Sequence, residues 1–217
     1  MNTDTTVGIT VGEVKGLRAD FEEKLASENG REWLEGFKLF LKKQNPWETA
    51  VKVVANVITL TVTSDGRKGK DFIRTLLQKD WRISGWAKDV LGKKAFDISV
   101  TNGVTYDLVI IKGEEFEDDG RITSKIREEA VRRGYLTPPA EVAPLLREKL
   151  SDEEIERMGL LWLVVMHDPI KDSGGGPDLL GVSRDDDGRW LDADYDKPGS
   201  WWGRGGGFVF LAPQVKA

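Results

Sequence analysis

LLWLVVMHDP, residues Leu160–Pro169, is the most apolar stretch of the chain and decides the fold that we predict. Its first seven residues are all apolar and would bury both faces of a strand, as in the centre of a sheet. A buried helix is the competing interpretation, but the short run, its adjacent valines and the flanking Gly159 and Pro169 favour a strand. The run is too short to cross a bilayer, which takes about 20 apolar residues.

The only histidine of the chain, His167, follows this run together with Asp168. Functional groups often lie where a buried strand leaves a sheet. A catalytic acid–base pair could be built from His167 with Asp168 or with a C-terminal aspartate. The simpler interpretation is a strand-end histidine that is satisfied by a local hydrogen bond. The chain contains no GxSxG nucleophile elbow. The sequence therefore favours a protein without catalytic activity, but it does not exclude an enzyme.

The rest of the sequence predicts an α+β protein with a mixed or mainly antiparallel sheet covered by helices. The β-branched segment Val53–Thr63 is expected to form one strand. Phe96–Val100 and Val104–Ile111 flank Asn102-Gly103 and are expected to pair as a hairpin, because both turn residues tolerate positive φ. Shorter strands are expected at 179–184, 189–191 and 208–212, and helices at about 122–133, 137–150 and from 151 onwards.

The first 50 residues are expected to form an N-terminal segment of two helices, followed by an α+β domain over residues 51–217. One continuous domain over residues 10–217 is the alternative. Thr10–Glu13 has the spacing of a capping box and predicts a helix to about Ser27. The second helix carries an aromatic stripe that includes Trp33 and Phe37, which we interpret as core packing rather than as a groove for a partner.

Composition limits the classes of function. The chain has 217 residues, no cysteine and a net charge of −5, so disulfides and thiolate metal sites are excluded. The N-terminus lacks the pattern of a signal peptide, and no stretch is long enough for a membrane helix. We therefore expect a cytoplasmic protein. Residues 151–217 carry 13 acidic and 7 basic side chains, a balance that would repel phosphate backbones.

A first candidate site is the loop Ser64–Asp71, SDGRKGKD, between a predicted strand and a predicted helix. Backbone amides in such a setting can bind an anion. The GK pair matches a Walker A motif, but a serine replaces its first glycine and an aspartate replaces its magnesium-binding hydroxyl. An anion or a nucleic acid could still contact Arg67, Lys68 and Lys70. The alternative is a solvated turn, and nucleic-acid binding is not favoured.

A second candidate is the series Asp192, Asp194 and Asp196. Alternate residues of an extended segment point the same way, so the three carboxylates could converge on calcium or magnesium. The spacing does not match an EF-hand. An exposed acidic loop without a metal is the simpler interpretation, and we expect no cofactor.

The third candidate gives the strongest functional hint. Trp190, Tyr195, Trp201, Trp202 and Arg204 lie in a glycine- and aspartate-rich region. Consecutive tryptophans are costly to expose, and Trp and Arg are enriched in interfaces. We therefore expect a non-catalytic binding or assembly module that contacts a protein partner or a second copy of the chain. A metal-assisted hydrolase centred on His167 and the aspartates, and a nucleic-acid-associated protein, are the alternatives.

Overall fold

The computed structural model describes residues 19–27, 30–41, 51–54, 57–185 and 188–213. The chain divides into two compact units, residues 1–49 and 50–217. In the first unit, residues 19–25 are helical and α2 spans Gly30–Leu41. Residues 10–18, where the first helix was expected to begin, lie outside the described ranges, so the N-terminal two-helix unit stays a prediction.

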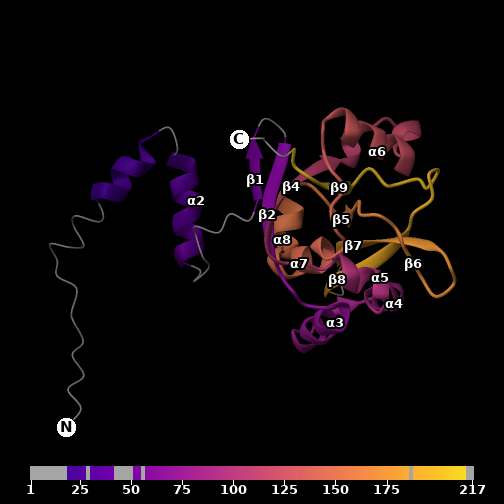
Figure 1. Cartoon of the computed structure of the whole chain (residues 1–217). Helices are drawn as coiled ribbons and strands as arrows, with labels where there is room; N and C mark the ends of the chain where they lie inside the picture. The colour runs from indigo at the N-terminus through magenta and orange to yellow at the C-terminus, as the bar shows by residue number, and fades with distance from the viewer. Residues whose placement is uncertain (1–18, 28–29, 42–50, 55–56, 186–187, 214–217) are drawn as a thin grey trace, which may run out of the picture. The chain divides into compact units, whose positions relative to one another are not determined.

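The second unit is an α+β structure built on one curled, mixed sheet (Figure 1). Eight of its strands follow one another across the sheet, and β6 pairs with β7 beside this path. Neighbouring strands are antiparallel, except for the parallel pairs β5–β9 and β3–β8. In spatial order the strands are β1 (Val51–Val54), β2 (Val57–Asp65), β4 (Asn102–Lys112), β9 (Gly206–Leu211), β5 (Trp162–Val165), β7 (Pro177–Asp185), β8 (Gly188–Tyr195) and β3 (Arg82–Ile83), with β6 at Ile170–Lys171.

The predicted central strand is confirmed as β5, which lies between β9 and β7. Leu163, Val164 and Val165 are fully or almost fully buried. Because side chains alternate along a strand, Leu163 and Val165 join the apolar core on one face of the sheet, and Val164 joins the core on the other. An unbroken apolar run is what this double burial requires.

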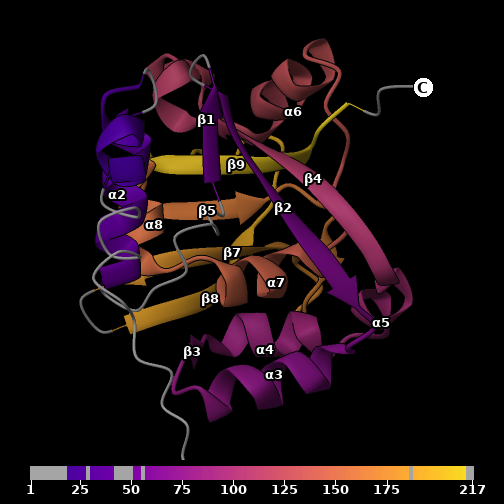
Figure 2. The ribbon, with the colours of Figure 1, turned by 90° about the vertical axis from the view of Figure 1, so that its left-hand side faces the viewer.

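Helices cover both faces of the sheet. The larger core receives side chains from α3, α4, α7 and α8, and the smaller core receives them from α6. Figure 2 shows α7 in front of the sheet, with α3 and α4 at the end that carries β3. The helices are α3 (Gly69–Gln78), α4 (Gly85–Leu91), α5 (Lys94–Ser99), α6 (Thr123–Arg132), α7 (Val142–Lys149) and α8 (Asp152–Arg157), with short 3-10 turns at Gly113–Glu115 and Asp118–Gly120.

The predicted hairpin over Phe96–Ile111 is wrong in its first half. Residues 96–99 belong to helix α5, where Phe96 is buried edge-on against Phe72 of α3 at 6.2 Å between ring centroids. The second half is confirmed within β4, which pairs with β2 and β9 instead. Gly103 does adopt a positive φ of 73°, but it lies at the start of β4. The tertiary contact of Phe96 outweighs the local alternation that suggested a strand.

The predicted strand Val53–Thr63 is two strands. β1 and β2 pair antiparallel, with Val53 opposite Ile58. Both segments are rich in β-branched residues, so strand propensity is right for each. Propensity alone does not show where such a run reverses direction.

A buried arginine ties helix α7 to the sheet. The Arg147 guanidinium is fully buried and donates from Nη1 to the Ser183 carbonyl of β7 at 3.0 Å. Its Nη2 donates to the Leu150 carbonyl at 2.6 Å and to Asp152 Oδ1 at 3.1 Å. Burial lowers the pKa of Arg147. These bonds connect α7 to the backbone of β7. They do so on the face of the sheet opposite to the one that carries the Ser183 side chain.

Replacing this arginine is expected to destabilise the fold strongly. Arg147→Ala leaves a cavity and unpaired carbonyls, and should lower the free energy of unfolding by about 3 kcal/mol. Arg132→Ala is the matched control, because Arg132 is exposed and pairs with Glu129 on the surface of α6; its cost should stay below about 1 kcal/mol. Urea unfolding measures both variants, and equal costs would contradict the bracing role.

Candidate functional site

A cavity of 470 Å³ lies over strands β5, β7 and β8. Strand register explains why their side chains meet there. Ser183 of β7 is opposite Trp162 of β5, and Gly181 of β7 is opposite Asp192 of β8. Residues opposite one another in antiparallel strands point to the same face. The lining residues are Trp162, Leu163, Gly181, Val182, Ser183, Asp192, Asp194, Tyr195, Ser200, Trp201, Trp202 and Gly203.

The floor of the cavity depends on a glycine. A Cβ on Gly181 would lie 2.8 Å from the backbone oxygen of Leu163 and 3.6 Å from Asp194 Oδ2. The first distance is too short for any real side chain, and the second shows that the Asp194 carboxylate lies close to the space above Gly181. A larger residue at this position would fill the space that the ligand of such a cavity needs.

The aromatic wall is fixed from behind. The rings of Trp162 and Trp202 lie 5.6 Å apart between centroids, and both pack edge-on against Phe208 at 5.8 and 5.9 Å. Trp202 is buried, and its Nε1 donates to Thr123 Oγ1 of α6 at 2.9 Å. Aromatic rings held at these separations contribute about 0.5–1.5 kcal/mol per pair beyond their burial. This side of the cavity is therefore rigid.

The neighbouring Trp201 lies at the rim instead. Its side chain is 62% exposed, although its Nε1 donates to the Asp118 carbonyl at 3.0 Å. The Arg121 guanidinium lies 5.5 Å from the centre of its ring. Tyr195 at the end of β8 is also exposed, with the Lys197 ammonium 4.9 Å from its ring centre. The consecutive tryptophans thus divide into one packed residue and one exposed residue.

Two carboxylates face this aromatic wall from β8. Asp192 Oδ1 accepts a hydrogen bond from the Ala193 amide at 2.8 Å. The Asp194 carboxylate has no donor and no ion-pair partner among the residues that the structure describes. Asp194 lines the cavity and is exposed to solvent. Loss of hydration, together with the charges of Asp192 and Asp178, raises the pKa of Asp194 to about 6.

The expected convergence of three aspartates on a metal is not found. β8 ends at Tyr195, so the alternation that aligns Asp192 and Asp194 stops before Asp196. Asp196 is buried and pairs with Arg127 Nη2 at 3.0 Å. Within the described ranges, no three histidine, aspartate or glutamate side chains lie close enough together to hold a metal ion. The structure therefore offers no support for calcium or magnesium there.

His167 makes local hydrogen bonds to the backbone. The ring is buried; Nε2 accepts from the Leu180 amide at 2.9 Å, and Nδ1 lies 2.7 Å from the Asp168 carbonyl. Because Nε2 accepts a hydrogen bond and Nδ1 lies against a carbonyl oxygen, the imidazole is the neutral tautomer with its proton on Nδ1. Burial lowers the pKa of His167 to about 4. Both ring nitrogens are thus occupied, and neither His167 nor Asp168 lines the cavity, which argues against the catalytic role considered from the sequence.

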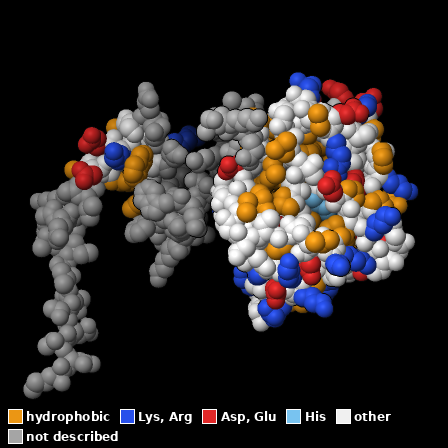
Figure 3. Space-filling view, viewed as in Figure 1, with side chains coloured by type: hydrophobic (Ala, Val, Ile, Leu, Met, Phe, Trp, Pro, Cys, Tyr) orange, Lys and Arg blue, Asp and Glu red, His pale blue; other side chains and the backbone are white. Residues whose placement is uncertain are grey.

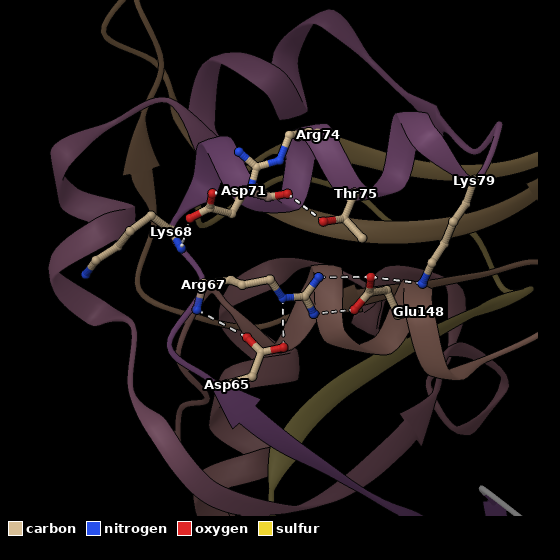
Figure 4. A network of polar contacts seen from close by, with 8 residues as sticks. All are labelled: Asp65, Arg67, Lys68, Asp71, Arg74, Thr75, Lys79 and Glu148. Atoms are coloured by element: carbon tan, nitrogen blue, oxygen red, sulfur yellow. Dashed lines mark hydrogen bonds and ion pairs between the residues drawn. The ribbon is translucent and has the colours of Figure 1, made fainter.

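The basic loop between β2 and α3 has the predicted strand–loop–helix setting, and its Arg67 is paired with Asp65 and Glu148 (Figure 4). Arg67 bonds Asp65 through Nε at 2.7 Å and Glu148 through both terminal nitrogens. Lys68 Nζ donates to the Asp97 carbonyl at 2.6 Å, and the first amide of α3, at Gly69, donates to Asp97 Oδ1 at 2.9 Å.

A carboxylate therefore already occupies the helix start at which a phosphate would bind. Lys70 is exposed. Charged side chains of both signs are interspersed on the face shown in Figure 3, without a continuous basic patch. This geometry gives no support to nucleic-acid binding through Arg67, Lys68 and Lys70.

The structure brings together only part of the predicted binding set. Tyr195, Trp201 and Trp202 line the cavity with two of the three aspartates. Trp190 lies outside it, with the Arg82 guanidinium 5.4 Å from its ring centre, and Arg204 is exposed outside it.

Sequence reasoning missed Trp162, Gly181 and Ser183, which also line the cavity. Trp162 was hidden inside the apolar run that predicts the central strand. The one available signal was Gly181, since a glycine within a strand often marks a close approach of backbone or ligand.

Comparison with protein-family models, with curated proteins and with solved structures gives no match to this chain. None of the helices in the described ranges is long and apolar enough to span a membrane. The functional argument therefore depends on the site itself.

The buried histidine is expected to make stability depend on pH. Its folded pKa of about 4 lies below the ordinary value of 6.5, so the unfolded chain takes up the proton first as the pH falls. His167 thus contributes stability that is present above about pH 6.5 and is lost as the pH falls towards 4.

His167→Gln removes this titration. The difference in unfolding free energy between wild type and variant should change by about 2 to 3 kcal/mol between about pH 7.5 and pH 4.5. Urea unfolding at both pH values measures it, and titrations of other groups cancel in the difference. A difference that does not vary with pH would show that the imidazole is not buried in its neutral form.

Proposed function

We propose that the protein is a binding module whose cavity over β5, β7 and β8 receives a small ligand or a protruding side chain of a partner. The observation that carries this proposal is the meeting of an aromatic wall with the unpaired Asp194 carboxylate. The volume of 470 Å³ falls within the range of about 300–1,000 Å³ that is usual for ligand pockets. The only histidine lies outside the cavity, so His167 does not supply acid–base chemistry there.

The polar groups of the cavity support orientation of a ligand. Rigid rings supply contact area, and a few polar groups fix direction and specificity. Ser200 is already engaged, because its hydroxyl donates to the Tyr195 carbonyl at 3.1 Å and accepts from the Lys197 amide at 3.1 Å. The exposed Asp194 carboxylate and the Ser183 hydroxyl have no hydrogen-bond partner among the described residues, so both are open to a ligand.

An NMR screen of the full chain with a mixed library of cationic, anionic and neutral fragments tests the proposal. Binding fragments are expected to shift the signals of Gly181, Asp194 and the Trp201 indole together, because these groups line one cavity. Ser183→Trp, which fills the cavity, should abolish these shifts. Thr61→Trp adds the same side chain at an exposed position of β2 and should leave them intact.

In the wild-type protein, fragment shifts that cluster elsewhere on the molecule would by themselves contradict the proposal. Equal binding by wild type and by a folded Ser183→Trp variant would contradict it as well.

A further inference from the structure

We propose that the cavity binds an organic cation, with an ammonium or guanidinium group held between the Asp194 carboxylate and the surrounding aromatic rings. This inference rests on the proposed function and adds the chemical class of the ligand. It is carried by the charge of the cavity, by its aromatic lining and by the pairing of the cations around it.

The carboxylates of the cavity lack a compensating charge. Asp192 and Asp194 are two residues apart on one face of β8, and their mutual repulsion contributes to the raised pKa of Asp194. In the part of the chain that the structure describes, no lysine or arginine pairs with Asp194. The nearest buried ion pair uses Arg127 for Asp196 instead. A cationic ligand would supply the missing charge, and an anionic ligand would be repelled.

The rings favour the same class of ligand. The faces of Trp and Tyr rings attract cations, by about 0.5–1 kcal/mol at exposed sites and by about 2 kcal/mol where water is excluded. At the rim, the protein's own cations already lie over Trp201 and Tyr195. Trp162 is a different case, since it lines the cavity and packs on Trp202, on Phe208 and on the backbone of Gly206. No lysine or arginine of the described residues lies over its indole.

A neutral sugar fits the polar groups less well. Sugar hydroxyls need several fixed donors and acceptors, whereas the Ser200 hydroxyl is engaged by backbone and Asp192 already accepts from the Ala193 amide. Two carboxylates face the aromatic rings, and neither has an ion-pair partner among the described residues, so a positive charge is favoured. The observations therefore favour a cation over a polyol.

Cation binding should weaken in acid. The charged groups that influence Asp194 are Asp192 on its own strand and Asp178 on β7, which the register places on the other face of the sheet; Lys197 lies over Tyr195 at the rim. Only ionised Asp194 pairs with a cation, and its pKa lies near 6. Affinity should therefore fall about tenfold between about pH 7.5 and pH 5, as the carboxylate takes up a proton.

Titration calorimetry on the full chain with four probes tests the inference: choline, agmatine, the uncharged choline isostere dimethylbutanol, and glucose. At about pH 7.5, at least one of the two cations should bind at least about tenfold more tightly than dimethylbutanol, a difference of about 1.4 kcal/mol. Asp194→Asn should remove this preference. Asp168→Asn removes an exposed carboxylate outside the cavity and should preserve it.

Two results would overturn the inference. Binding of dimethylbutanol or glucose as tight as that of the cations, with cavity signals shifted, would leave a binding cavity that does not select for charge. Absence of binding by both cations would also exclude this ligand class. The proposed function fails only if, in addition, the fragment screen finds nothing in the cavity, so the two failures are distinguishable.

Discussion

The contact between the indole of Trp162 and the backbone of Gly206 is the constraint on which the site depends. The parallel pairing of β5 and β9 places these two residues opposite each other. A Cβ on Gly206 would lie 1.9 Å from the Trp162 ring, so only a glycine gives the indole room there. Trp202 and Phe208 then pack on the same ring. Through Trp202, this packing positions the segment that closes the cavity.

The site differs from several other parts of the second unit in the pairing of its charged side chains. Three buried or partly buried ion pairs lie elsewhere in this unit: Arg67 with Glu148, Arg127 with Asp196, and Arg147 with Asp152. Such pairing is expected, because an unpaired charge away from water is costly. Asp194 differs from these groups, because it is exposed, lines the cavity beside aromatic rings and has no ion-pair partner among the described residues. Exceptions of this kind tend to concentrate where a protein binds or reacts.

Much of the architecture was predictable from local pattern, and little of the site was. The apolar run around Val164 and the short segments 179–184 and 189–191 predicted strands that the structure confirms, although β8 continues to Tyr195. The Phe96 segment became a helix because of a contact with α3, which no local pattern encodes. The cavity depends on the register of β5, β7 and β8, which local pattern does not fix, so Gly181 and Asp194 could not be brought together by spacing alone. The aromatic and acidic composition indicated the region only.

The most direct test of the central claim compares Gly206→Ala with Gly199→Ala in urea unfolding followed by tryptophan fluorescence. A Cβ on Gly199 meets no atom within 4 Å, so that variant should keep the stability and emission of the wild type. Gly206→Ala should displace the Trp162 indole, shift the emission and lower the free energy of unfolding by about 2 kcal/mol. Equal stability and identical emission in the two variants would contradict the account.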